Sequence, residues 1–251
     1  MQRIWTPVLL ALLGLSAWEC AARLGWISNL FFPAPSSIAR TFVELVLDGT
    51  IVGHLASSGR RLFLGLLLGT LPGVTLGLLM GWSARARSFL DPFVAALHPI
   101  PKIAILPLIM AIFGIGEASR LVVIAVSAFF PMLINTMSGA IQISPSLFEA
   151  ARNYGARGLQ IFGRVLFPGS LPSVLSGFRL ALNTSLLITV AVELVTARQG
   201  LGAMVWLAWE TMRLEQLYAG LALMALLGIG FNILVRWLAY RLVPWQEDRE
   251  G

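Results

Sequence analysis

The chain has 251 residues, of which 57% are hydrophobic and 12% are charged, and its formal net charge is +6. This composition is too apolar for a soluble domain and predicts a protein that crosses a membrane several times. Because the arginines lie near the ends of apolar runs, the charge indicates membrane orientation and not a nucleic-acid partner. One cysteine and two histidines far apart in sequence argue against an intramolecular disulfide or a metal site, and no cofactor is expected.

The first apolar run covers residues 4–18 and continues to residue 22 despite Glu19, which predicts a first span. A secretory signal is the alternative, but the following AARLGW is not a convincing cleavage site. After the loop FFPAPSS, residues 37–47 place apolar and charged side chains on different faces, which predicts an interfacial helix. We therefore expect 1–57 to form one span and an outer interfacial segment.

The second predicted span, residues 62–82, has no charge and carries a glycine at every fourth position: Gly65, Gly69, Gly73, Gly77 and Gly81. Such a row removes side chains from one ridge, so the backbone of another helix can pack closely. Steps of four residues wind around a helix of 3.6 residues per turn. We expect either a right-handed crossing with one neighbour or two neighbours that share the row. Glycine merely tolerated in a membrane helix is the alternative.

The basic turn at 83–87 should lie in the cytoplasm. Pro99 and Pro101 then interrupt an apolar run, which predicts a short helix at 92–98, a break, and a third span at 101–115 with a kink near Pro107. Lys102 is the chain's one lysine and should reach the cytoplasmic interface. It does not follow a glycine loop, so the chain has no Walker A motif and another subunit must bind any ATP.

A fourth span is predicted at 121–141, a fifth at 172–195 and a sixth at 216–235, with an interfacial helix at 203–213. The fifth is the most polar. Side chains in and beside these spans are candidates for a solute path, although hydroxyls often bond their own helix backbone instead. The candidates are Lys102, Asn135, Arg179, Asn183, Ser185, Thr189 and Glu193.

Residues 144–172 form a polar, positively charged loop between the fourth and fifth spans. Ser144 followed by Pro145 predicts a helix start, and Gly155 predicts its end. A second helical piece is predicted from about Arg157 to Pro168. The loop should be a cytoplasmic docking element.

The spacing of this loop resembles the EAA loop of ABC-importer permeases, whose pattern is E-A-A-x3-G-x9-I-x-L-P. It matches from Glu149 through Gly155 to Pro168, with Val165 in place of isoleucine and Phe167 in place of leucine. The run HPIPKIAILPLIMAIFGIGEASR also resembles that family, specifically the branch that imports nitrate, sulfonates and taurine.

The resemblance implies an all-α polytopic fold with six transmembrane helices and the type I, MetI-like importer architecture. It implies a permease core over 58–245, a polar tail at 246–251, and a coupling helix that sits in a groove of an ATP-hydrolysing subunit. The residues expected at that docking surface are Glu149, Ala150, Ala151, Tyr154, Gly155, Arg157 and Pro168.

The expected partners are two ATP-binding subunits, a second copy of this chain, an extracytoplasmic solute-binding protein and the lipid bilayer. The chain would then be a non-enzymatic permease for a small anionic solute in a bacterial inner membrane, with both termini in the cytoplasm. An ion-coupled secondary transporter is the alternative, for which Glu193 is the lone acidic candidate. A membrane hydrolase is disfavoured because GxSxG and HExxH are absent, and a simple adaptor would not need polar residues inside a span.

Overall fold

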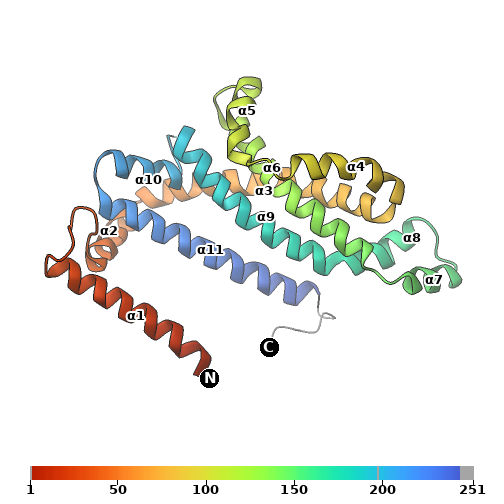
Figure 1. Cartoon of the computed structure of the whole chain (residues 1–251), viewed down its shortest axis with the longest axis horizontal. Helices are drawn as coiled ribbons and strands as arrows, with labels where there is room; N and C mark the ends of the chain where they lie inside the picture. The colour runs from red at the N-terminus through yellow and green to blue at the C-terminus, as the bar shows by residue number, and fades with distance from the viewer. Residues whose placement is uncertain (1, 197, 244–251) are drawn as a thin grey trace. The chain divides into compact units, whose positions relative to one another are not determined.

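The computed structural model describes residues 2–196 and 198–243, with side chains described from residue 9 onward. Every element assigned in this part of the chain is helical. The helices are α1 (Gln2–Arg23), α2 (Pro35–Leu47), α3 (Thr50–Trp82), α4 (Ala84–Leu97), η1 (Lys102–Ile105), α5 (Leu106–Phe113), α6 (Glu117–Ile141), α7 (Pro145–Asn153), α8 (Leu159–Ile161), η2 (Phe162–Leu166), α9 (Phe167–Thr196), α10 (Leu201–Glu210) and α11 (Leu214–Leu242) (Figure 1).

These helices divide into two compact units. The first unit holds the described residues up to 58 together with 193–226, and the second holds 59–192 together with the described residues from 227 onward. Because α3, α9 and α11 each begin in one unit and end in the other, the division does not follow the helix boundaries. The predicted organisation into 1–57, 58–245 and 246–251 stays a prediction, and its tail lies outside the described residues.

Among the described residues, four helical segments are long and apolar enough to cross a membrane: Thr50–Trp82, Glu117–Ile141, Leu159–Thr196 and Leu214–Leu242. A helix needs about 20 apolar residues to do so, and α1, with 22 residues, also has that length. The side chains of residues 2–8, where the first predicted span begins, lie outside the described part. A further candidate is the broken pair α4 and η1–α5, so each of the six predicted spans has a helical counterpart.

The predicted break before residue 101 is present, but the third span predicted at 101–115, with a kink near Pro107, is too short here to cross a membrane by itself. A 3-10 turn (η1) and the eight-residue α5 occupy this stretch, and α5 ends at Gly114, whose φ is +80°. The pair formed with α4 is bent by 87° at the break. Two prolines, Pro101 and Pro107, each lack a backbone donor, which explains why no single long helix forms here.

The helix before that break begins earlier than predicted. It starts at Ala84 and not at residue 92, because the hydroxyl of Ser83 accepts a hydrogen bond from the backbone N–H of Ala86 at 3.3 Å. This N-cap satisfies one of the free donors at the helix start. The basic residues predicted to form a turn are therefore the first turn of α4.

The helical piece that enters the fifth span does not stop at Pro168, contrary to the prediction. Helical structure continues from Leu159 to Thr196 through the π-helical segment η2, Phe162–Leu166. A π-turn shifts the hydrogen-bond register by one residue. The missing N–H of a following proline then leaves no gap in the hydrogen bonds of the preceding turn. Pro168 consequently lies in the first turn of α9.

In the second unit, α3 and α6 pack along the glycine row. A Cβ built on any of Gly65, Gly69, Gly73, Gly77 or Gly81 would lie within 3.0 Å of an atom of α6. One neighbour therefore takes the whole row. The core continues from this seam into α9 and α11, where the buried apolar side chains are Leu62, Leu66, Ala128, Ala181, Leu182 and Val235.

In the first unit, α1 and α2 are joined by polar contacts. The Glu19 carboxylate accepts hydrogen bonds from the backbone N–H of Ser36 at 3.0 Å and from Arg23. The ring of Trp18 packs edge-on against Tyr218 at a centroid distance of 5.6 Å, and the Tyr218 hydroxyl donates to the carbonyl of Phe31. These contacts connect α1 and its following loop to α11.

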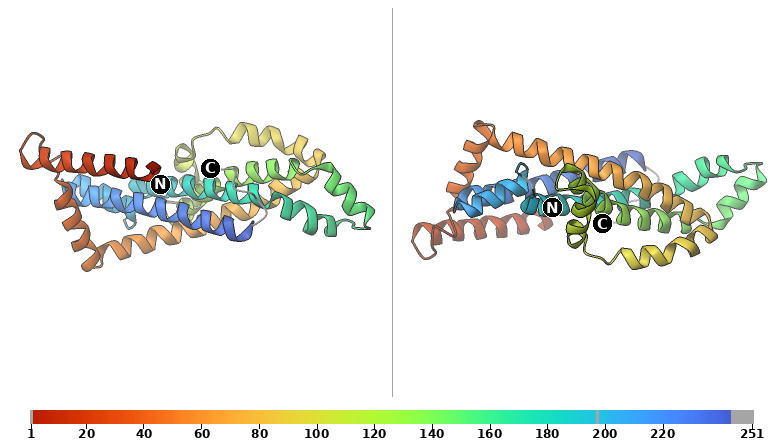
Figure 2. Two further views of the ribbon diagram at one scale, coloured as in Figure 1. Left: turned by 90° about the horizontal axis from the view of Figure 1, so that it is seen from below. Right: turned by 90° about the horizontal axis from the view of Figure 1, so that it is seen from above.

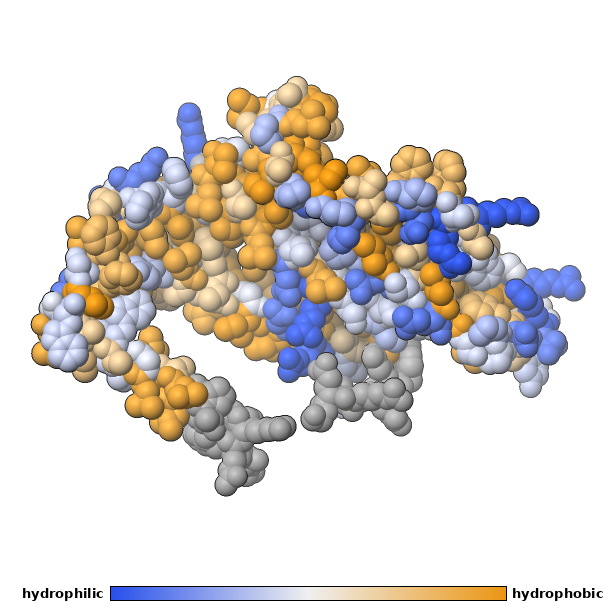
Figure 3. Space-filling model, in the orientation of Figure 1, coloured by the Kyte–Doolittle hydropathy of each residue, from blue (hydrophilic) through white to orange (hydrophobic). Residues whose placement is uncertain are grey.

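The surface of the helices is strongly apolar. Within the second unit, Figure 3 shows apolar residues gathered over α5, where Leu108 and Ile112 are more than 60% exposed, and hydrophilic residues gathered toward α7. Contiguous exposed apolar surface on this scale is expected where lipid, not water, is the solvent.

Candidate docking surface and transport path

The loop helix α7 has the ends that its sequence predicts. It covers Pro145–Asn153, with Ser144 at the N-cap position and Pro145 at the first helical position. The Ser144 hydroxyl bonds that of Ser146 at 2.7 Å and makes no capping bond to the backbone. The proline, with its preset φ and missing donor, is therefore the signal that begins this helix.

Gly155 ends α7 in a Schellman motif. Its φ is +83°, its N–H donates to the carbonyl of Arg152 at 2.9 Å, and the N–H of Ala156 donates to the carbonyl of Ala151 at 2.9 Å. This pair of bonds satisfies the last carbonyls of the helix and requires a left-handed residue, which glycine supplies without a Cβ penalty. The predicted end of the helix is confirmed.

α7 lies beyond the end of α6 and, with α8, extends past the helices of the second unit (Figures 1 and 2). None of its residues, all of which are described, is buried. Tyr154 is 94% exposed, Leu159 87% and Leu147 55%. Large apolar side chains at this level of exposure on a cationic loop are suited to a protein partner.

The structure brings most of the predicted docking residues together. Glu149, Ala150 and Ala151 lie in α7, and Tyr154 and Gly155 lie at its C-terminal end. The remaining two are elsewhere along the loop. Arg157 lies in the turn before α8, where its N–H donates to the Gln160 side chain at 3.2 Å, and Pro168 lies in α9.

Two of the path candidates meet a residue that sequence reasoning missed. The amide of Asn232, on α11, accepts a hydrogen bond from Arg179 at 3.0 Å and donates to Asn183 at 3.1 Å. Arg179 is exposed, and Asn183 is half-buried. Asn232 is the one amide within an otherwise apolar stretch of α11, and that isolated polarity is the signal that could have revealed it.

Three other candidates bond either the backbone of their own helix or a neighbouring helix. The hydroxyl of Thr189 donates to the carbonyl of Ser185 at 2.7 Å, and the side-chain amide of Asn135 donates to the carbonyl of Pro131 at 2.8 Å. Ser185 is fully buried, and its hydroxyl lies 3.1 Å from that of Ser127 on α6. These bonds join helices or satisfy a helix's own backbone, as small polar side chains commonly do in membranes.

The side chain of Lys102 caps the C-terminal end of α4. Its Nζ donates to the carbonyl oxygens of His98 at 2.6 Å and Ile100 at 2.8 Å, and lies 4.6 Å from the ring centre of Phe130. A cation at a helix C-terminus satisfies free carbonyls and interacts favourably with the helix dipole.

The last candidate, Glu193, belongs to the first unit and is 0% exposed. Its carboxylate lies within hydrogen-bond distance of the Ser58 hydroxyl and accepts from the N–H of Gly202 at 3.0 Å. Gly202 is in the first turn of α10, so the carboxylate is placed at the positive end of that helix. The contacts of Glu193 thus connect three segments of the unit.

A cluster of three arginines around Glu117 is a second polar feature missed from sequence. Arg61, whose side chain is 6% exposed, makes two hydrogen bonds to Glu117, at 2.9 and 2.7 Å, and Arg120 makes one at 2.7 Å. Arg60 is more distant, at 3.9 Å, and largely exposed. The bidentate pair joins α3 to the start of α6, and 56 residues separate its members in sequence.

An all-α, multi-pass fold with an exposed loop helix of this spacing defines the membrane-spanning subunit of an ABC importer. The chain belongs to the family described as "Binding-protein-dependent transport system inner membrane component", whose model matches residues 73–248. It is therefore a transport permease of the inner membrane. The comparisons give no support to the secondary-transporter alternative.

Curated relatives cover nearly the whole chain. The putative aliphatic sulfonates transport permease protein SsuC of Bacillus subtilis is 36% identical over 94% of this chain and 86% of its own length. The taurine transport system permease protein TauC of Escherichia coli is 35% identical over 93% and 87%. The nitrate import permease protein NrtB of Leptolyngbya laminosa is 30% identical over 84% and 78%.

Solved structures agree on the fold. An inward-facing form of the MetNI methionine ABC transporter matches with a TM-score of 0.68 and 21% identity, over 77% of this chain and 95% of that one. A second inward-facing crystal form of the same transporter gives a TM-score of 0.64 at 20% identity. The predicted fold class, an all-α polytopic permease of the MetI-like type, is confirmed.

Proposed function

We propose that this permease imports a small anionic solute of the sulfonate, taurine or nitrate type, driven by an ATP-binding subunit that docks on α7. The observation that carries the proposal is the exposed helix Pro145–Asn153 with its Schellman end at Gly155. The helix is rigidly terminated, cationic at its end through Arg152, and free of buried residues. It provides a preformed surface for a partner, so little conformational freedom is lost on binding.

The energy for transport comes from outside this chain. The sequence has no Walker A motif, because its one lysine is not preceded by a glycine loop. The transporter would contain two ATP-binding subunits, a second copy of this permease and an extracytoplasmic solute-binding protein. Closure of the ATP-binding pair would move the docking helices and bias the permease between inward and outward openings.

The solute class rests on the relatives, whose names refer to aliphatic sulfonates, taurine and nitrate. Each of these solutes carries an anionic group. The exposed Arg179, oriented by Asn232 on the neighbouring helix, is the path candidate suited to such a group, since a guanidinium binds oxyanions well. The other candidates are Lys102, Asn135, Asn183, Ser185, Thr189 and Glu193.

The docking loop would face the cytoplasm, and both termini with it. Arg85 and Arg87 at the start of α4, and Arg152, Arg157 and Arg164 in and after α7, lie at the same ends of the spans. Short loops rich in arginine remain on the cytoplasmic side. In this orientation α7 would lie on the cytoplasmic side of the membrane, where it could bind an ATP-binding subunit.

The test is reconstitution with the cognate ATP-binding subunit and solute-binding protein. Gly155→Val forces a β-branched residue into the left-handed region, and Glu149→Arg reverses a charge on α7. Both variants should remain in the membrane but lose co-purification of the ATP-binding subunit and solute-stimulated ATP hydrolysis.

Gly49→Val is the matched control. Gly49 has a similar φ of +79° and, like Gly155, no neighbouring atom within 4 Å of a built Cβ. It lies between α2 and α3, so the same local strain should leave co-purification unchanged. Full co-purification and full stimulation by both docking variants would contradict the proposal.

A further inference from the structure

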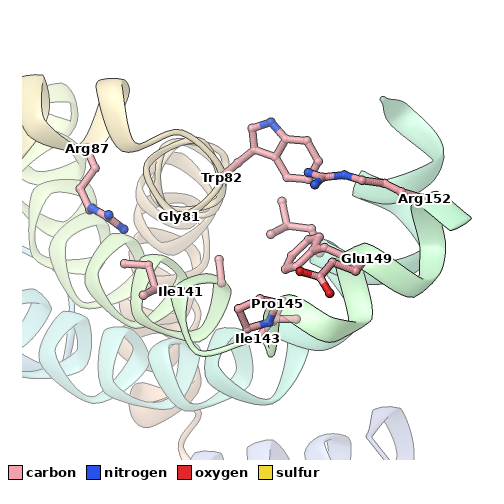
Figure 4. A pocket seen from close by; sticks show the side chains of 11 residues that line it. Gly81, Trp82, Arg87, Ile141, Ile143, Pro145, Glu149 and Arg152 are labelled. Atoms are coloured by element: carbon pink, nitrogen blue, oxygen red, sulfur yellow. The ribbon is translucent and has the colours of Figure 1, made fainter. Parts of the chain in front are cut away.

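A pocket of about 370 Å³ lies between the ends of α3 and α6, the start of α4, and α7 (Figure 4). This volume is in the range of small-molecule sites. All of its lining residues belong to the second unit. They are Gly81, Trp82, Arg87, Ala140, Ile141, Ile143, Pro145, Phe148, Glu149, Arg152 and Leu166.

Three charged side chains line this pocket. Arg87 reaches it from α4, and Arg152 and Glu149 reach it from α7 on another side (Figure 4). Neither guanidinium forms an ion pair with a carboxylate in the described part of the chain. The site thus presents two separated cations and one anion, all with hydrogen-bonding capacity left for a ligand.

The rest of the lining is apolar and lies where the spans end. Trp82 is the last residue of α3 and Ile141 the last of α6, and both are more than 40% exposed. Trp82 packs edge-on against Phe148 of α7 at 6.2 Å. Tryptophan at the end of an apolar span is typical of the boundary between hydrocarbon and water. The pocket is therefore amphipathic and at the level of lipid head groups.

We infer that this pocket binds the head group of a phospholipid that carries a phosphate and a primary ammonium, as in phosphatidylethanolamine. The phosphate lies between Arg87 and Arg152, because guanidinium groups bind phosphate oxygens by charge-assisted hydrogen bonds. The ammonium meets Glu149, and the acyl chains leave past Trp82 and Ile141.

Charge favours this head group over its alternatives. Phosphatidylglycerol carries the same phosphate but a neutral glycerol in place of the ammonium, so it would leave the negative charge of Glu149 without a cation to offset it. Free phosphate would leave the apolar lining at Trp82, Ile141 and Phe148 exposed to water. A zwitterionic lipid is complementary to all three charges and to the apolar wall.

The experiment uses the purified chain alone in detergent, so its result does not depend on docking or transport. Native mass spectrometry follows titrations with short-chain phosphatidylethanolamine, phosphatidylglycerol and inorganic phosphate. Phosphatidylethanolamine should bind saturably with one tight site. Arg87→Gln should weaken that site about fivefold, the change that corresponds to one basic residue at a lipid surface.

Arg85→Gln is the matched control, because Arg85 lies on the same turn of α4 but does not line the pocket. It should change the affinity less than twofold. Arg152→Gln, on the opposite side of the site, should weaken binding as Arg87→Gln does and provides a second variant if one fails to fold.

Glu149→Gln tests whether the pocket distinguishes phosphatidylethanolamine from phosphatidylglycerol. It should weaken phosphatidylethanolamine and strengthen phosphatidylglycerol, because it removes the partner of the ammonium and the repulsion of the anion. Three results would overturn the inference: stronger binding of phosphatidylethanolamine by Glu149→Gln, equal effects of Arg85→Gln and Arg87→Gln, or binding of inorganic phosphate as tight as that of phosphatidylethanolamine.

Discussion

The hydroxyl of Ser58 lies 2.8 and 2.7 Å from the two carboxylate oxygens of Glu193, although 135 residues separate them in sequence. The same hydroxyl accepts the N–H of Leu201 at 2.8 Å. Both side chains are buried. A charge removed from water is stable only when its oxygens are hydrogen-bonded, so this serine supports both the acid and the start of α10.

Removing that hydroxyl should destabilise the protein measurably. Ser58→Ala leaves a buried carboxylate and a helix N-terminal donor with one fewer partner, which should cost about 1–3 kcal/mol. A lower thermal unfolding midpoint in detergent would show it. Ser176→Ala is the control, because Ser176 is exposed and its hydroxyl donates to the carbonyl of Pro172 in its own helix. Equal midpoints for the two variants would contradict the interpretation.

A methyl group at Gly200 should be tolerated poorly. The φ of Gly200 is +131°, and a Cβ there would lie within 3.0 Å of the Glu193 carboxylate. Gly200→Ala should therefore reduce the yield of folded protein, with a cost above the 1–3 kcal/mol typical of backbone strain alone. Gly25→Ala, at φ +74° with no atom within 4 Å, isolates the strain. Size-exclusion profiles would compare the two.

Two alanine substitutions in α3 should change the free energy of unfolding in opposite directions. Gly77→Ala would place a Cβ 2.7 Å from the carbonyl oxygen of Leu133 and 2.7 Å from the Cβ of Thr136, so overpacking should cost about 1–3 kcal/mol. Gly59→Ala meets open space and should stabilise the helix by about 0.5–1 kcal/mol, because it restricts the unfolded chain. Unfolding midpoints that shift in the same direction would show that the seam is looser than described.

Neutralising Glu117 should lower the stability of the protein more than removing an exposed arginine beside it. Glu117→Gln removes the negative charge from the bidentate pair that Glu117 makes with the buried guanidinium of Arg61, which should cost about 1.5–3 kcal/mol. Arg60→Gln removes a contact of 3.9 Å from a side chain that is 66% exposed, and should cost less than about 1 kcal/mol. Measuring the free energy of unfolding of both variants at low and high salt would check which of them is less stable.

The features that sequence predicts well are those with a local cause. Pro145 begins α7 and Gly155 ends it because each preset backbone conformation acts within one turn. The glycine row was visible for the same reason, as a regular spacing along one helix. The identity of its single neighbour, α6, could not be predicted, because the spacing of residues in one helix does not reveal which helix packs against it.

The features that were missed depend on distant residues or on competition between local signals. Arg61 meets Glu117, and Arg179 meets Asn232, only after the helices have packed. Pro168 reads as a helix stop, but the register change in the preceding π-segment accommodates it. Long-range contacts of this kind leave no periodicity in the sequence.

The glycine seam has a mechanical consequence. Two further glycines extend the close packing from α6 to α9: a Cβ at Gly139 would meet Ser173, and one at Gly177 would meet Asn135 at 2.8 Å. Where backbones touch in this way, there are no flexible side chains between them to rearrange, and sliding one helix along another would drive carbonyl groups into each other. The α3–α6–α9 layer of the second unit should therefore behave as one stiff plate, which moves as a unit and does not bend.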